Sequence, residues 1–133
     1  MNLIGQNAKK ASLEKINTKT KNKILKKYAS LLDKEKKTII IENAKDLKFA
    51  LKKGLKKNLI DRLAINHNKL DDIKASINKI IKLKDPIDNI LEKWNRPNGL
   101  KIKRVSIPIG VIGVIYESRP NVTSDVASLC FKS

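Results

Sequence analysis

Apolar residues recur at helical spacing along the first 86 residues. Side chains three, four and seven positions apart share one face of an α-helix, and polar residues fill the positions between them. The pattern predicts five helices, at residues 3–13, 18–32, 33–54, 58–63 and 70–81. Thr18 and Asp33 are expected N-caps, and Gly54 is suited to ending the third helix. Pro86 closes the helical part, because proline disfavours the α region for the preceding residue.

The sequence after Pro86 has the pattern of a β-hairpin. Asn98-Gly99 predicts a two-residue type I′ turn, because both residue types tolerate the positive φ that its central positions need. We expect paired strands over residues 90–96 and 100–107. The apolar positions of the second strand change face between Lys103 and Arg104, which indicates a β-bulge at that step.

An apolar run at residues 107–116, interrupted only by two neutral glycines, predicts a strand buried on both faces, as in parallel sheets covered by helices. A polar loop and a helix over residues 122–131 follow. In α/β sheets, ligands bind at the carboxyl ends of strands, and the free N–H groups of a helix start attract anions. The candidate site residues at this junction are Glu117, Ser118, Arg119, Asn121 and Thr123. The run contains neither a G-x-G-x-x-G fingerprint nor a P-loop.

The formal net charge of +17 suggests an anionic partner such as nucleic acid. Lysine supplies 26 of the 30 basic residues, whereas recognition of bases and phosphates favours arginine. The lysines are spread along the helices, and aromatic residues for base stacking make up only 4% of the chain. We therefore interpret the charge as solvated helix surface.

The remaining chemistry-bearing residues suggest packing or surface roles. His67 lies between two predicted helices and is expected in a surface loop, and no ligand spacing indicates a metal site. Cys130 has apolar neighbours and is expected to be a packing residue. A single cysteine fits a reduced, cytoplasmic setting. We find no secretory signal and no apolar run of about 18 residues that would span a membrane.

Three segments closely resemble the gamma-glutamyl phosphate reductase family, also called glutamate-5-semialdehyde dehydrogenases, of the aldehyde dehydrogenase superfamily: RPNGL at 96–100, IPIGVIGVIYESRPNVT at 107–123 and SLCFKS at 128–133. Weaker similarity is present in ENAKDL at 42–47 and IDRL at 60–63. The resemblance implies NADPH-dependent reduction of L-glutamate 5-phosphate to L-glutamate 5-semialdehyde and phosphate, in proline biosynthesis. It also implies a homo-oligomer and a contact with glutamate 5-kinase.

The resemblance implies an α/β fold that is truncated in this chain. Residues 1–86 would form the helical amino-terminal part of the cofactor domain. Residues 87–106 would form a hairpin of oligomerisation strands, on which Trp94 is an interface anchor or an ordinary cross-strand packing residue. Residues 107–133 would form the first strand, loop and helix of a Rossmann-like sheet. The nucleophilic cysteine would lie beyond this chain, so the 133-residue polypeptide alone is predicted to be inactive.

The resemblance also implies roles for the polar loop, although Pro and Asn would favour a plain turn there as well. The superfamily places an asparagine after this strand, where its amide donates to the oxyanion. Asn121 is the candidate donor, while gapless matching puts Arg119 at that place. We assign Arg119, with Glu117 and Ser118, to substrate binding, because arginine binds carboxylate or phosphate in a bidentate manner. The alternatives are a basic helical nucleic-acid-binding module and a non-catalytic remnant of the reductase.

Overall fold

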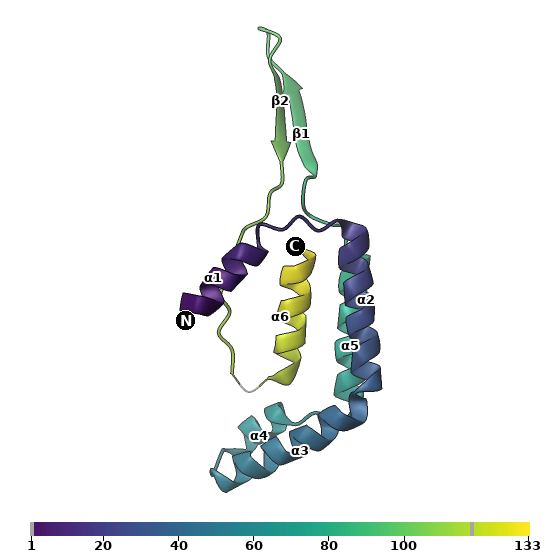
Figure 1. Ribbon diagram of the computed structural model, residues 1–133, viewed down its shortest axis with the longest axis vertical. Helices are drawn as coiled ribbons and strands as arrows, with labels where there is room; N and C mark the ends of the chain where they lie inside the picture. Colours follow the sequence, from purple (N-terminus) through teal and green to yellow (C-terminus); the bar gives the residue numbers. More distant parts are fainter. Residues whose placement is uncertain (1, 118) are drawn as a thin grey trace. The chain divides into compact units, whose positions relative to one another are not determined.

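The computed structural model describes residues 2–117 and 119–133, and it combines α-helices with one two-stranded sheet (Figure 1). The described chain divides into two compact units. The helical unit comprises residues 17–83 and 114–132, and the hairpin unit comprises residues 2–16, 84–113 and 133.

The helical unit contains the four longest helices and one short one: α2 (Thr18–Lys34), α3 (Lys36–Lys52), α4 (Lys57–Leu63), α5 (His67–Lys82) and α6 (Pro120–Lys132). All were predicted from hydrophobic periodicity. The end of α3 is also as predicted, because Gly54 follows it with φ +70°, a conformation that glycine adopts without strain.

Two of the predicted caps and the loop assignment of His67 are wrong. Asn17 caps α2, since its side-chain oxygen accepts the Thr20 N–H at 2.9 Å. Glu35 precedes α3, and Asp33 is instead the last-turn residue of α2 that pairs with Lys74. His67 is the first residue of α5, because the preceding asparagine provides the cap.

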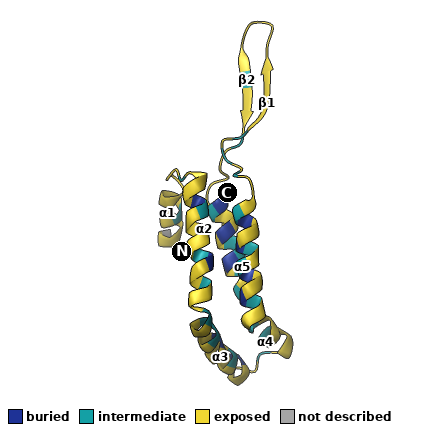
Figure 2. Cartoon of the chain, turned by 90° about the vertical axis from the view of Figure 1, so that its right-hand side faces the viewer, coloured by how far each residue is buried: buried dark blue, intermediate teal, exposed yellow. Residues whose placement is uncertain are grey.

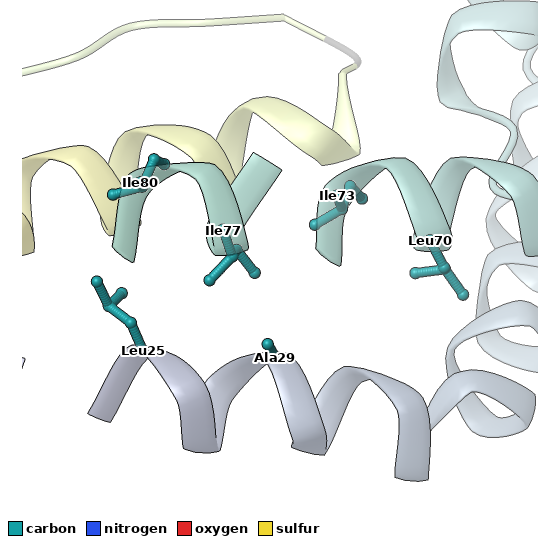
Figure 3. Close-up of a cluster of buried hydrophobic side chains, with 6 residues drawn as sticks. All are labelled: Leu25, Ala29, Leu70, Ile73, Ile77 and Ile80. Atoms are coloured by element: carbon teal, nitrogen blue, oxygen red, sulfur yellow. The ribbon is translucent and has the colours of Figure 1, made fainter. Parts of the chain in front are cut away.

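The core of the helical unit lies between α2 and α5, which run antiparallel (Figure 3). Ile77 is 0% exposed and points from α5 toward Leu25 and Ala29 of α2. The six buried members of this cluster are Leu25, Ala29, Leu70, Ile73, Ile77 and Ile80. Figure 2 shows the buried residues concentrated on the facing sides of these helices. The burial confirms the apolar stripes that the sequence predicts.

A buried polar side chain fixes the connection between α4 and α5. Asn43 of α3 is only 5% exposed. Its amide nitrogen donates to the Leu63 carbonyl at 3.0 Å, and its oxygen accepts the Ile65 N–H at 2.7 Å. Both ends of the amide form hydrogen bonds, and these bonds offset the cost of removing the side chain from water.

The hairpin unit contains α1 (Asn2–Ala11) and the antiparallel strands β1 (Ile90–Asn95) and β2 (Lys101–Val105). The predicted hairpin is confirmed, but its turn and its bulge differ. The Gly99 N–H donates to the Arg96 carbonyl, and only Gly99 in the turn has positive φ, at +82°. This geometry is a type I turn followed by a glycine bulge, and it arises because Pro97 cannot donate the second hydrogen bond that a two-residue turn requires.

The irregularity in the ladder lies on β1 instead of β2. Ile90 pairs with Val105 and Glu92 pairs with Arg104, so Leu91 is the extra residue. The predicted position between Lys103 and Arg104 is therefore wrong, although the observed bulge faces the neighbouring step. A change of face on one strand marks a bulge in the pair without showing which strand carries the added residue.

Residues 107–116 do not form the predicted buried strand in this chain. They form neither a helix nor a strand, and they have no strand partner among the described residues. Ile109 is 88% exposed and Ile115 is 102% exposed. A strand cannot satisfy its own backbone groups, and parallel pairing needs a crossover connection to a second strand. The described residues contain no such connection, so the apolar run remains uncovered.

Candidate functional site

The candidate site lies at the start of α6, where the sequence places most of its polar loop. Pro120 is the first helical residue, a position that suits proline because its missing N–H would be unpaired there. Asn121 follows and is exposed. Its amide nitrogen lies 3.4 Å from Oδ2 of Asp125, one turn further along α6. This long contact leaves the amide available to a ligand.

Arg119 and Glu117 are exposed residues beside this helix start, and the Arg119 carbonyl accepts the Val122 N–H at 3.0 Å. Ser118 lies outside the described residues. Oγ1 of Thr123 lies 2.6 Å from the Tyr116 hydroxyl oxygen, and this hydrogen bond joins the end of the apolar run to α6. Arg119 and Asn121 therefore both lie at the start of α6, whereas Thr123 forms a local hydrogen bond.

A groove runs between α5 and the first half of α6, and Asn121 is part of its wall. The residues that line it are Lys69, Asp72, Ile73, Ser76, Asn121 and Asp125. Four of them come from α5, a helix that the sequence pattern does not connect with the site. The four-residue spacing of Asn121 and Asp125 places both on one helix face, and this spacing was the signal in the sequence.

The charged side chains of this groove differ in the hydrogen bonds and ion pairs that they form. The Lys69 ammonium donates to the carbonyl oxygens of Ala64 at 2.6 Å and Asp61 at 3.2 Å. Asp72 is exposed and forms no ion pair within the described part of the chain. Oδ1 of Asp125 is buried and has no hydrogen-bond partner among the described atoms. The exposed carboxylate of Asp72 can therefore accept hydrogen bonds from a ligand, whereas Oδ1 of Asp125 is closed off from the groove.

The side of α6 that packs into the helical unit is polar. Ser124, Ser128 and Lys132 follow one another at four-residue spacing and are 5%, 2% and 2% exposed. The Lys132 ammonium donates to Oδ1 of Asn22 at 2.7 Å and approaches the Ile81 carbonyl at 3.5 Å. Small serines allow close helix approach, and the buried ammonium is held by neutral oxygens near the carboxyl end of α5, where the helix dipole favours a cation.

Cys130 is exposed, so its expected packing role is wrong for this chain. It lies two positions from Ser128, on a different side of α6 from the buried stripe. Its place near the carboxyl end of the helix is as expected. Among the described residues, no group of three or more His, Cys, Asp or Glu side chains is arranged to hold a metal ion. Within the same residues, no helix has both the length and the apolar character needed to cross a membrane.

The carboxyl group of Asp71, which lies outside the groove, has a lowered pKa. The Lys36 ammonium, 2.6 Å from Oδ1 of Asp71, lowers the pKa of Asp71 through a hydrogen bond and charge attraction. This ion pair joins the start of α3 to the second turn of α5. It is exposed and belongs to the scaffold of the helical unit.

Curated relatives of this chain are gamma-glutamyl phosphate reductases. The protein of that name from Clostridium botulinum is 45% identical over 133 aligned positions, which cover 98% of this chain and 32% of the relative. The one from Nautilia profundicola is 48% identical over 118 positions, covering 89% of this chain and 29% of the relative. No protein-family model matches the chain.

Solved structures agree with the sequence comparison. The crystal structure of gamma-glutamyl phosphate reductase from Thermotoga maritima is similar with a TM-score of 0.91 and 41% identity, over 96% of this chain and 31% of that one. The corresponding Saccharomyces cerevisiae structure has a TM-score of 0.91 and 31% identity, over 98% of this chain and 34% of that one. This chain is homologous to gamma-glutamyl phosphate reductases.

The homology to gamma-glutamyl phosphate reductases has a definite extent. The chain spans about a third of the length of the relatives it matches. The match falls on the amino-terminal part of the solved reductase structures. The resemblance drawn from the sequence motifs is therefore confirmed.

Proposed function

We propose that this chain serves as the amino-terminal third of an NADPH-dependent gamma-glutamyl phosphate reductase. The reaction is the reduction of L-glutamate 5-phosphate to L-glutamate 5-semialdehyde and phosphate, a cytoplasmic step of proline biosynthesis. The single observation that carries the proposal is 45% identity to the Clostridium botulinum reductase across 98% of this chain. The similarity favours this function over nucleic-acid binding, which only the charge suggests.

In the proposed mechanism, the thiolate of a cysteine outside this segment attacks the acyl phosphate carbon and phosphate leaves, which forms a thioester. The part of this chain in the reaction is to stabilise charge and position the substrate. Asn121 would donate its amide N–H groups to the oxyanion that forms at the attacked carbon. Its exposed place in the first turn of α6 supports this role, because the helix dipole there also favours negative charge.

Arg119 would bind a phosphate or carboxylate group of the substrate, with Glu117 and Ser118 near it in the loop. The exposed Arg119 guanidinium is two positions from Asn121, and guanidinium groups bind such anions through two parallel hydrogen bonds. Anion binding beside a helix start is also favoured by unpaired backbone N–H groups. Arg119 and Asn121 would then hold the two ends of the acyl phosphate group.

The described residues do not fit the nicotinamide cofactor. The groove at Asn121 carries the carboxylates of Asp72 and Asp125, which would repel a pyrophosphate, and the chain contains no dinucleotide fingerprint. NADPH would therefore be bound by residues outside this segment. The contribution that we assign to this chain is limited to substrate and oxyanion.

We further propose that residues 107–116 become the first strand of a Rossmann-like sheet in the complete enzyme. The uncovered Val and Ile side chains of this run support that role. Residues 1–86 would then be the helical part of the cofactor domain, and residues 87–106 would mediate homo-oligomerisation. Trp94 is 40% exposed on β1, which suits an interface anchor. The complete enzyme would also contact glutamate 5-kinase.

A completed chain tests the proposed function directly. It joins residues 1–133 of this protein to the part of the Thermotoga maritima reductase that follows the matched third. We expect it to oxidise L-glutamate 5-semialdehyde in the presence of phosphate and NADP, the reverse of the proposed reaction. The parent Thermotoga maritima enzyme is the positive control. A completed chain that is folded and yet inactive, beside an active parent, would contradict the proposal.

A further inference from the structure

The hydrogen bond between Tyr116 and Thr123 closes the loop that carries the proposed site residues. The Tyr116 hydroxyl oxygen lies 2.6 Å from Oγ1 of Thr123, which is seven positions later in the chain. Tyr116 is the last residue of the apolar run, and Thr123 is the fourth residue of α6. Arg119 and Asn121 lie between them in the sequence. The hydrogen bond therefore connects the residue that enters the loop with the helix that leaves it.

The other hydrogen bonds at this helix start are local. The Val122 N–H donates to the Arg119 carbonyl at 3.0 Å, and the Asn121 amide nitrogen lies 3.4 Å from Oδ2 of Asp125. Neither contact reaches back to the apolar run. The run itself has no strand partner among the described residues, so no ladder fixes the position of its last residue. The bond between the two hydroxyl groups therefore joins the run directly to α6.

A connection across this loop matters because an oxyanion donor is effective only when it is held in place before the reaction. Each backbone residue that moves freely must lose conformational entropy when the donor reaches its position. The two side chains suit such a connection. A tyrosine ring has only two side-chain torsions, and the β-branched Thr123 has a restricted χ1, so both hydroxyl groups are directed with little freedom.

We propose that Tyr116 and Thr123 are positioning residues, whose hydrogen bond holds the loop so that the Asn121 amide can donate to the oxyanion. This inference rests on the proposed function, because it takes the donor role of Asn121 from it. Tyr116 is 45% exposed and Thr123 is exposed, so removing either hydroxyl group does not open a cavity in the core. Variants at both positions are therefore expected to fold.

Steady-state kinetics of the completed chain test the proposal. Tyr116→Phe keeps the ring without its hydroxyl group, and Thr123→Val replaces the hydroxyl group by a methyl group. Each should lower kcat about tenfold and change KM for L-glutamate 5-semialdehyde by less than about twofold, because a misplaced donor is lost mainly in the transition state. The double variant should be no slower than either single variant, since both remove the same bond. Thr123→Ser, which retains the hydroxyl group, should keep kcat within about twofold.

The Asn121→Ala background distinguishes a positioning role from a direct contact with the substrate. With no donor left to position, Tyr116→Phe should have no further effect on kcat there. Tyr28→Phe is the matched control, because it removes the hydroxyl group of the other tyrosine, which packs beside the core of the helical unit. It should leave kcat unchanged. A normal kcat in Tyr116→Phe, or a further loss in the Asn121→Ala background, would overturn the proposal.

Nuclear magnetic resonance relaxation on the 133-residue chain separates the failure of this inference from that of the proposed function. The backbone order parameters of Arg119 and Asn121 should fall from about 0.85 to below about 0.6 in Tyr116→Phe, while those of α5 stay unchanged. Unchanged values at both residues would contradict the positioning role, whether or not the completed chain is active. Absence of activity in the unsubstituted completed chain would count against the proposed function, and the order parameters would still decide the role of Tyr116.

Discussion

The α2–α5 core and the run at residues 107–116 are both rich in branched aliphatic residues, and they have opposite outcomes in this chain. Ile77 in α5 is 0% exposed, whereas Ile115 in the run is 102% exposed. A helix satisfies its own backbone and needs only one covered face, which a neighbouring helix supplies. A strand needs partners on its edges as well as on its faces. An apolar segment is therefore buried only where a neighbouring helix or strand is present to cover it.

The largest expected effect is on the stability of the helical unit. Ile77→Ala should lower the free energy of unfolding by about 2–5 kcal/mol, because it removes a fully buried side chain and leaves a cavity. Ile115→Ala is the matched control and should change stability by less than about 0.5 kcal/mol in the 133-residue chain. Urea denaturation followed by circular dichroism would measure both. Similar losses for the two variants would remove the contrast between the regions.

The next effect concerns the start of α6, where the two kinds of region meet in sequence. In the completed chain, Asn121→Ala should lower kcat by about 10²-fold, the usual consequence of losing an oxyanion donor. Arg119→Ala should mainly raise KM, because a contact to a substrate anion is made in the ground and transition states alike. Steady-state kinetics of both variants would show which residue acts as the oxyanion donor and which contacts the substrate anion. If Arg119→Ala lowers kcat and Asn121→Ala has no effect, the two roles are reversed.

A smaller effect is expected in the hairpin turn. Gly99 has φ +82°, and a Cβ there would be strained, so Gly99→Ala should weaken the hairpin by about 1–2 kcal/mol. Gly113 has no positive φ and open space around its Cβ position, so Gly113→Ala should have no effect. Nuclear Overhauser contacts between Trp94 and Ile102, which are paired across the strands, would report hairpin population. Unchanged contacts in Gly99→Ala would argue against the observed turn.

The smallest effect is the pH dependence that Asp71 contributes. Its pKa is lowered in the folded chain, chiefly by the hydrogen bond from Lys36, so its stabilising contribution is present above the unfolded-state pKa and is lost as pH falls through the folded-state value. Asp71→Asn should therefore lower Tm slightly at pH 7, and the difference from the unsubstituted chain should disappear as pH falls through the folded-state pKa. Asp72→Asn, without an ion pair among the described residues, is the control. A Tm difference that does not change with pH would contradict this account.

The helices could be predicted because their stripes are local. Hydrophobic spacing located α2 to α6, but it did not distinguish Asn17 from Thr18 as the cap of α2. The hairpin was also evident from Asn98-Gly99, while its turn type depended on Pro97, whose missing N–H excludes the expected closing pair.

The candidate site could be predicted only on its α6 side. Asn121 and Arg119 were named from the polar loop and the family motif. Asp72 and Ser76 were not, because they lie about 45–50 positions earlier and reach the groove only through the packing of α5 against α6. Cys130 was misplaced because its apolar sequence neighbours suggested burial, whereas α6 buries its serines.

Hydrogen exchange at residues 107–116 tests most directly the central claim that this run becomes a strand only when neighbouring strands are present to pair with it. In the 133-residue chain, its amides should exchange at nearly unprotected rates, while those of α5 around Ile77 are protected. In the completed chain, the amides that donate to neighbouring strands should slow by at least about a hundredfold. Strong protection of the run in the 133-residue chain, or none in a folded and active completed chain, would contradict the account.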